Sequence, residues 1–357
     1  MTEQAHFAFA EYSRIADLEQ QWEQLDRIGE SQDMPYVSYS FYQTYIWHKF
    51  LYDYIHNNPL RQLTVKFSYV LMTYDGLPFA IIPLYITRSS GKMRFPSCRV
   101  AGILNATAPF PMKGNEGKYA ALQRYIEENY KAKKLSWADV PQCSPFAEVM
   151  RNLGGNYTER ASYHVPLSEY ATIDEYIGSL SKNIYKNIRK AYNHQKTDGK
   201  NVELKVYTYD TLPGNKYLYQ LWRIYFIRKL AWNGRQVGTL GKVKASVKAI
   251  TEIMTGCATK SLRRLKESRL YVLEIDSVPA AFMIVYAHRK HLLMPRLAID
   301  TTYSRYSPGI VLLLESAKLW LDEGIVDFDM CRGDERYKTD MGGVNEPLCR
   351  IERGKII

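Results

Sequence analysis

The stretch from Arg305 to Ile310 combines groups that could bind an anion. Ser307 suits the N-cap of a helix, because its hydroxyl can accept a hydrogen bond from a first-turn amide. Pro308 at the first helical position loses no hydrogen bond. The first amides of a helix lie at the positive end of its dipole, where anions bind favourably. Arg305 adds a charged donor. We therefore predict an anion site, although a well-capped helix without a ligand remains the alternative.

A second group of ionisable residues lies at positions 332–338, which read RGDERYK. Carboxylates can act as general bases and a tyrosine hydroxyl as a general acid. Asp334 and Glu335 are therefore candidate bases, and Tyr337 is a candidate acid. The two carboxylates could instead only form salt bridges with Arg332, Arg336 and Lys338.

The elements around these two groups follow the order strand, loop, helix, strand, charged loop. Residues 292–294 are apolar and predict a short strand. A helix is predicted by the spacing of its apolar residues and by a glycine at its end: Ile310, Leu314, Ala317, Leu321 and Gly324. Alternation of apolar and acidic residues over 326–330 predicts the next strand.

Both segments match a known family through the residues Asp300, Tyr303, Tyr306, Ser307, Pro308 and Gly309, then Asp327, Phe328, Arg332, Gly333, Asp334, Glu335, Tyr337 and Lys338. The pattern resembles the acyltransferases related to the cellulose-biosynthesis protein CelD, which belong to the GNAT (Gcn5-related N-acetyltransferase) superfamily. The resemblance covers the C-terminal half closely and the N-terminal half loosely. It implies acyl-coenzyme A as co-substrate, with no metal and no permanently bound cofactor.

The resemblance also implies roles for individual residues. Glu335 would be the base, with Asp334 as second candidate, and Tyr337 the acid. Donor binding would use Arg305, Tyr306, Ser307, Gly309 and Ile310. Substrate binding would use Lys186, Arg189, Asp300, Arg332 and Lys338, although Asp300 could equally cap the turn before the loop.

The loop departs from the usual superfamily pattern, Gln/Arg-x-x-Gly-x-Gly/Ala. Its basic residue, Arg305, stands four positions before Gly309, Pro308 lies inside it, and a second small residue is missing. The related Fem-type peptidoglycan aminoacyltransferases share the tandem architecture and use aminoacyl-tRNA. A tRNA-dependent reaction therefore stays open.

Positive charge is concentrated in one part of the chain. The net charge is +11, and the segment from Lys182 to Arg269 holds 20 Lys or Arg against five acids, which is +15 and leaves −4 for the rest. Such a segment attracts polyanions, tRNA included. It could also be a set of basic helices whose charges are merely solvated.

The two halves of the chain share a pattern. A hairpin turn at Asp75 has a counterpart at Asp276, and in each half a loop, a helix and a strand follow. We predict an α/β fold of tandem GNAT-like domains with mixed sheets, divided into 1–165 and 166–357. The first copy lacks the Ser-Pro-Gly loop, so it would be degenerate and act as scaffold or acceptor wall.

Other classes of protein are disfavoured. The five cysteines are scattered without a CxxC pair, which argues against a disulfide framework or zinc site and favours a cytoplasmic location. No run of roughly 18 apolar residues predicts a membrane span, and the N-terminus does not resemble a secretory signal.

The sequence predicts an acyltransferase that moves an acyl group from coenzyme A to an amine or hydroxyl of a saccharide or small metabolite. Polysaccharide or cell-envelope biosynthesis is the expected setting. The alternatives are a Fem-like transferase using aminoacyl-tRNA and a non-enzymatic module that binds an anionic polymer or membrane surface.

Overall fold

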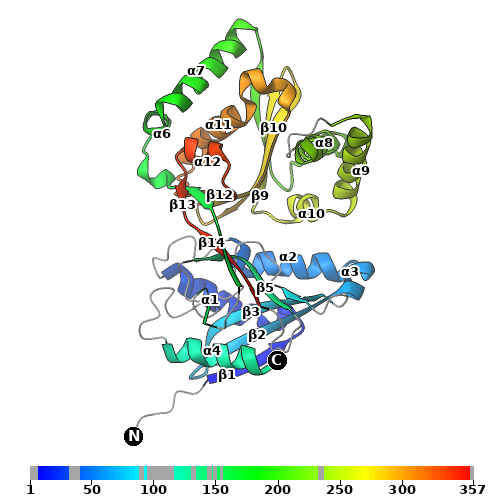
Figure 1. Ribbon diagram of the computed structural model, residues 1–357, viewed down its shortest axis with the longest axis vertical. Coiled ribbons are helices and arrows are strands. Elements are labelled where there is room, and N and C mark those ends of the chain that lie inside the picture. The colour runs from blue at the N-terminus through cyan, green and yellow to red at the C-terminus, as the bar shows by residue number, and fades with distance from the viewer. Residues whose placement is uncertain are drawn as a thin grey trace. The chain divides into compact units, whose positions relative to one another are not determined.

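The structure is a computed structural model that describes residues 7–31, 41–87, 92–94, 116–129, 134–142, 147, 151–152, 156–231 and 237–353. The chain divides into two compact units, Met1–Ser162 with Asn345–Ile357, and Tyr163–Val344 (Figure 1). The sequence prediction assigned all of 166–357 to the second domain. The C-terminal residues instead join the first unit, because their strand pairs within the first sheet.

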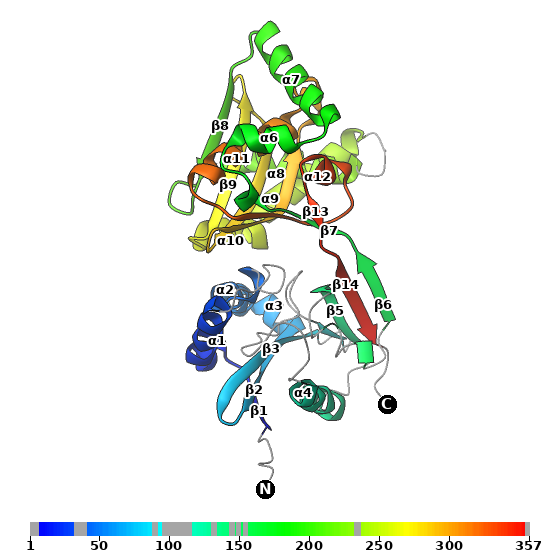
Figure 2. The ribbon, with the colours of Figure 1, turned by 90° about the vertical axis from the view of Figure 1, so that its left-hand side faces the viewer.

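The first unit is a seven-stranded sheet with helices. Its elements are β1 (Phe7–Tyr12), α1 (Glu19–Ser31), α2 (Tyr45–His56), α3 (Pro59–Thr64), β2 (Val65–Tyr74), β3 (Leu77–Thr87), β4 (Lys92–Arg94), α4 (Glu116–Asn129), β5 (Lys134–Pro141), β6 (Asn156–Arg160) and β14 (Leu348–Arg353), with 3-10 turns at Ile15–Leu18 and Phe41–Gln43. The strand order is β1-β2-β3-β4-β5-β14-β6. Figure 2 shows β14 between β5 and β6.

The second unit repeats this plan. Its elements are β7 (Ser162–Val165), a 3-10 turn (Leu167–Glu169), α6 (Ile173–Ser179), α7 (Lys182–Thr197), β8 (Val202–Tyr207), α8 (Asn215–Ala231), α9 (Thr239–Thr255), α10 (Cys257–Arg264), β9 (Ser268–Ile275), β10 (Val278–His288), β11 (His291–Ile299), the 3-10 turn η5 (Thr301–Tyr306), α11 (Pro308–Asp322), β12 (Asp327–Arg332), α12 (Arg336–Asp340) and β13 (Val344–Asn345). The order β13-β7-β12-β11-β10-β9-β8 is that of the first sheet read backwards.

The two sheets correspond strand by strand. Strands β8 to β12 take the places of β1 to β5, and β11 and β12 are parallel, as β4 and β5 are. The predicted hairpin turns are confirmed at Asp75 and Asp276, whose φ angles of 48° and 52° are left-handed, as a two-residue hairpin requires.

Helices cover both faces of the second sheet. Residues from α7 and α11, such as Ile188 and Leu314, share one buried cluster with Met283 of β10. Phe282, the residue before Met283 in β10, points to the opposite face of the sheet, as the pleat requires. There its ring packs against Trp222 of α8, with the ring centroids 5.8 Å apart. Figure 1 accordingly shows α7 and α11 on one side of β9 and β10 and α8 on the other.

Candidate active site

Strands β11 and β12 pair only where they begin. Their register runs from His291–Asp327 to Leu293–Asp329 and then stops, although β11 continues to Ile299. The end of β12 turns at Cys331, which has a left-handed φ of 60° and donates its N–H to Asp329 Oδ1 at 2.6 Å. The carboxyl ends of two central parallel strands therefore diverge.

A cavity of about 390 Å³ lies at this divergence. Residues from β11, the start of α11, the charged loop and α8 line it: Arg228, Leu297, Ala298, Ile299, Ser304, Ser307, Pro308, Gly309, Ile310, Leu313, Glu335 and Tyr337. The two groups that the sequence analysis singled out thus share one cavity. Its wall is largely apolar, and the polar and charged side chains are few.

Ser307 occupies the N-cap of α11 but does not cap it with its side chain. Its backbone is left-handed, with φ 46° and ψ 54°, and its hydroxyl makes no hydrogen bond to the first turn. A serine cap requires an extended backbone at this position, so the predicted role of the hydroxyl is wrong. The Ser307 carbonyl instead accepts from Ile310 N–H at 3.0 Å and Val311 N–H at 3.1 Å.

Gly309 is the second residue of α11 and lines the cavity. An N–H at this helical position has no acceptor within its own helix, so it can serve a ligand. A Cβ at this position would lie 3.0 Å from Ile299 Cγ2. The glycine therefore allows α11 to begin close against β11.

Arg305 and Tyr306 do not belong to the cavity wall. Arg305 donates to Asp198 through Nε at 2.8 Å and through a terminal nitrogen at 3.3 Å, and Tyr306 donates its hydroxyl to the same carboxylate at 3.0 Å. These hydrogen bonds lower the pKa of Asp198. The three side chains tie η5 to the end of α7.

Asp300 has the capping role that the sequence analysis left open. Its carboxylate accepts from Thr302 N–H at 2.9 Å and from the Thr302 hydroxyl at 2.8 Å, and so holds the start of η5. Asp300 is not among the residues that line the cavity.

Lys338 is 2% exposed and is surrounded by oxygen atoms of its own loop. Its ammonium donates to the carbonyls of Arg332, Cys331 and Gly333 at 2.6, 3.0 and 3.3 Å, and lies 3.0 Å from Glu335 Oε2. An ammonium has three donors, so these contacts account for all of them. The structure thus places Lys338 inside the loop, as a tie between its carbonyls.

Glu335 and Tyr337 face the cavity, whereas Asp334 and Arg332 are exposed and do not line it. Glu335 immediately precedes α12 and Tyr337 is the second residue of that helix. Burial, with the nearby charges of Glu335 and Cys331, raises the pKa of Tyr337 well above its usual value. Its hydroxyl is therefore protonated at neutral pH. Glu335 forms a salt bridge with Lys338, as the alternative to a catalytic role had suggested, and the same carboxylate borders the cavity.

Lys186 and Arg189 are exposed on α7 and lie outside the cavity wall. The opposite side of that helix buries Ile184 and Ile188 in the core. The structure therefore does not bring these two cations together with Glu335.

Several lining residues were missed by the sequence analysis. Arg228 reaches the cavity from α8, and Leu297 and Leu313 supply much of its apolar wall. Arg228 lies in the basic segment, but nothing in its local pattern separates it from the other cations there. Only the crossing of α8 over β11 singles it out.

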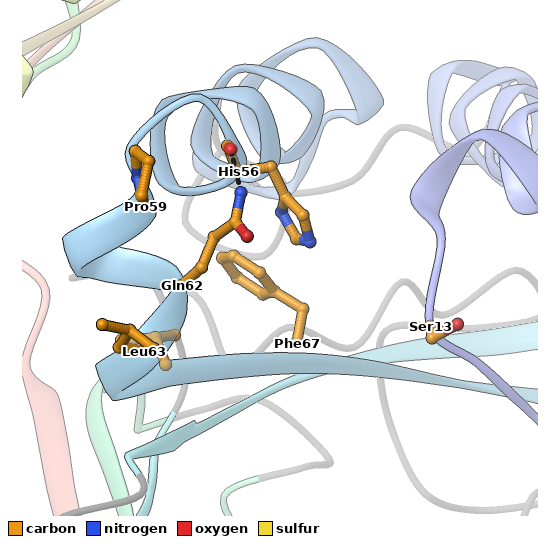
Figure 3. Close-up of a pocket in the computed structure, with 7 residues that line it drawn as sticks. Ser13, His56, Pro59, Gln62, Leu63 and Phe67 are labelled. Atoms are coloured by element: carbon orange, nitrogen blue, oxygen red, sulfur yellow. Dashed lines mark hydrogen bonds between the residues drawn. The ribbon is translucent and has the colours of Figure 1, made fainter.

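The first unit has a cavity of its own, of about 400 Å³, at the end of α2 (Figure 3). Figure 3 shows His56, Gln62 and Phe67 converging there, with the Gln62 amide donating to the His56 carbonyl. The His56 ring stacks on Tyr52 with centroids 3.8 Å apart. Ser13, His56 and Gln62 are the polar lining among the described residues, which offers no paired acid and base.

Residues 182–339 match the family described as acetyltransferase (GNAT) domain. This segment of the second unit is therefore similar to a GNAT domain. This match covers every candidate site residue of the sequence analysis.

Solved structures that are similar over almost the whole chain include two with TM-scores above 0.5. One is a tandem GNAT protein from the clavulanic acid biosynthesis pathway, with 9% identity, 98% of each chain covered and a TM-score of 0.53. The other is FemX, with 10% identity, 92% of this chain and 95% of that chain covered, and a TM-score of 0.54. At such identities the similarity shows the fold alone, and it confirms the predicted tandem GNAT fold. No protein of curated function matches the sequence.

Within the described ranges, no cluster of three or more His, Cys, Asp or Glu residues is placed to hold a metal ion. Among the same residues, no helix has the length and apolar character needed to cross a bilayer.

Proposed function

We propose that this protein is an acyltransferase that moves an acyl group from coenzyme A to an amine or hydroxyl of a sugar, amino sugar or small metabolite. One observation carries the proposal: the cavity beside the divergence of β11 and β12 is lined by the first residues of α11 together with Glu335 and Tyr337. Following the resemblance to CelD-like proteins, the acceptor would belong to polysaccharide or cell-envelope biosynthesis. The cytoplasm would be the place of reaction.

The donor would lie along the open edge of β11. Its apolar arm would contact Leu297, Ile299 and Leu313, which line the cavity. Its pyrophosphate would approach the first amides of α11, Gly309 N–H among them, where the helix dipole favours an anion. Arg228 would add positive charge to the same wall. Arg305 and Tyr306 would act indirectly, because their bonds to Asp198 hold the loop that leads to these amides.

The reaction would be a direct transfer. The acceptor nitrogen or oxygen attacks the thioester carbonyl carbon while Glu335 takes its proton. The carbon–sulfur bond then breaks, and the Tyr337 hydroxyl protonates the departing thiolate. A tyrosine hydroxyl carries its proton at neutral pH, so Tyr337 has a proton to donate. Among the two candidate bases, cavity exposure favours Glu335 over Asp334.

Aminoacyl-tRNA is the second candidate donor. It is favoured by the segment from Lys182 to Arg269, whose net charge is +15. Binding of tRNA to such a surface would weaken steeply with salt. In this case the cavity would hold the aminoacyl end, and most of the affinity would come from phosphate contacts outside it.

Separate titrations with acetyl-coenzyme A and with aminoacyl-tRNA test the choice of donor. Our proposal expects saturable binding of acetyl-coenzyme A, competed by coenzyme A and only modestly sensitive to salt. Binding of tRNA alone, with a steep salt dependence and no coenzyme A binding, would reverse the order of the two candidates.

A further inference from the structure

Helix α9 exposes a continuous apolar stripe. Its residues recur at alternating intervals of three and four, which places them on one side of the helix; they are Leu240 (86% exposed), Val243 (56%), Val247 (58%), Ile250 (49%) and Met254 (66%). In Figure 1 the helix lies on the outer side of α8. Large exposed apolar surfaces of this kind mark sites of interaction.

The stripe is not the face that attaches α9 to its own unit. The opposite side of the helix carries Ala245, Ala249 and Ile253, which are buried. Helix α9 packs there against α8 and α10. Packing within the second unit therefore explains why the side with Ala245 and Ala249 is apolar. It does not explain why the exposed stripe is apolar.

The charged residues of α9 indicate which kind of partner the stripe would bind. Lys242, Lys244 and Lys248 are exposed on the same helix. The acid of α9, Glu252, is turned toward α10, where it accepts from Thr259 N–H at 3.3 Å. The surface around the stripe is therefore apolar and positive.

A second copy of α9 is a poor match for this surface, because pairing two such stripes would bring the lysines of both copies together. An anionic bilayer matches both features. Apolar side chains enter the boundary between headgroups and acyl chains, while lysines extend to the lipid phosphates.

We propose that α9 docks this protein on an anionic lipid bilayer, with the stripe from Leu240 to Met254 inserted and the flanking lysines at the lipid phosphates. This inference does not depend on the proposed acyl transfer. It adds a location for the protein, at a membrane surface, that the active-site cavity does not require.

Vesicle co-sedimentation of the full chain tests whether the apolar stripe binds lipid. The probes are vesicles of phosphatidylcholine with roughly 30 mol% phosphatidylglycerol, and vesicles of phosphatidylcholine alone. The double variant Val247→Ser, Ile250→Ser should bind the anionic vesicles about ten-fold more weakly or worse than the unaltered protein. The matched control Leu60→Ser, Leu63→Ser alters two leucines of α3 that are 75% and 65% exposed, and its binding should stay within about two-fold.

A second variant tests whether the lysines of α9 contribute to binding. Lys242→Gln with Lys244→Gln should weaken binding to anionic vesicles by about five-fold for each lysine and leave the weak binding to neutral vesicles unchanged. All of these side chains are exposed, so circular dichroism and thermal unfolding should not change. This variant keeps the question answerable if the serine variant fails to fold.

Four results would overturn the proposal. The unaltered protein could ignore anionic vesicles, or the α3 control could lose binding as much as the α9 variant. Sedimentation could show a dimer that the α9 variant abolishes, which would assign the stripe to a second copy. Oxidation of Met254 could be as slow as that of the buried Met283, which would mean that another part of the chain covers the stripe.

Discussion

At the scale of single residues, Glu335 and Tyr337 reach the same cavity although one position separates them. They do so because Glu335 ends the charged loop in an extended conformation and Tyr337 already belongs to α12. Lys338 stabilises this arrangement, because its ammonium donates hydrogen bonds to three carbonyls of the loop. We therefore propose chemical roles for the carboxylate of Glu335 and the phenol of Tyr337, and a structural role for Lys338.

Glu335→Gln should reduce kcat by about 10²- to 10⁴-fold, because the variant cannot take the acceptor's proton. Its affinity for acetyl-coenzyme A should stay within about two-fold, since the amide keeps the shape of the side chain. Steady-state kinetics with a calorimetric titration of the donor provide both numbers. An unchanged kcat would remove Glu335 from the reaction.

Lys338→Met should lower the free energy of unfolding by about 3 kcal/mol, because three partly buried loop carbonyls and the Glu335 carboxylate lose their donor. The matched control is Lys186→Met on α7, where the side chain is exposed and the cost should stay below about 0.5 kcal/mol. Urea denaturation measures both. Equal stability of the two variants would mean that Lys338 does not hold the loop.

His48 makes the stability of the first unit depend on pH. Burial lowers its pKa to about 3, below the value of about 6.5 in the unfolded chain. Protons therefore bind the unfolded state first, and stability is lost as pH falls from about 6.5 toward 3. Between pH 7.5 and 5.0 the loss due to His48 should be about 2 kcal/mol.

The variant His48→Gln checks this directly, because it cannot titrate. Urea denaturation at the two pH values should show a smaller acid-induced loss than in the unaltered protein. The same pH difference in both proteins would mean that His48 is not the group responsible.

At the scale of elements, the sequence predicts α11 well and its surroundings poorly. Pro308 and Gly324 bound a helix that the structure places at Pro308–Asp322, and the predicted strand over 326–330 is observed as Asp327–Arg332. Ser307 does not cap the helix with its hydroxyl, because its φ is left-handed. Nothing in the local sequence indicates a left-handed φ at this serine. The divergence of β11 from β12 and the approach of Arg228 are long-range features that residue spacing does not encode.

Gly309→Glu should abolish acetyl-coenzyme A binding, because its side chain would press on Ile299 and place a carboxylate in the proposed phosphate site. The matched control is Gly178→Glu on α6, which adds the same charge where a Cβ meets nothing within 4 Å. Calorimetric titration should show donor binding in the control and not in Gly309→Glu. Equal affinity in both would place the donor elsewhere.

At the scale of the whole molecule, the tandem fold shows more than a repeated hairpin. Hairpins at Asp75 and Asp276 revealed the duplication in the sequence. The strand beside β12, however, is β7, from before the second unit's helices, and the strand beside β5 is β14, from the C-terminus. Both strands are short, and their residues do not indicate which strand each will pair with. The sequence therefore could not assign residues 345–357 to the first unit.

Leu348→Ala should destabilise the first unit by about 2–5 kcal/mol, since the side chain is fully buried. Amide hydrogen exchange should accelerate in β5 and β6, which pair with β14, and remain unchanged in β10 and β11. Faster exchange in the second sheet alone would contradict the strand assignment.

The central claim is that the divergence of β11 and β12 receives the thioester donor. A crystal structure of the protein with acetyl-coenzyme A tests it most directly. We predict the donor's apolar arm beside Leu297 and Ile299, its pyrophosphate at the amide of Gly309, and the acetyl group within reach of Glu335. Coenzyme A bound elsewhere, with this cavity empty or filled by protein side chains, would contradict the account.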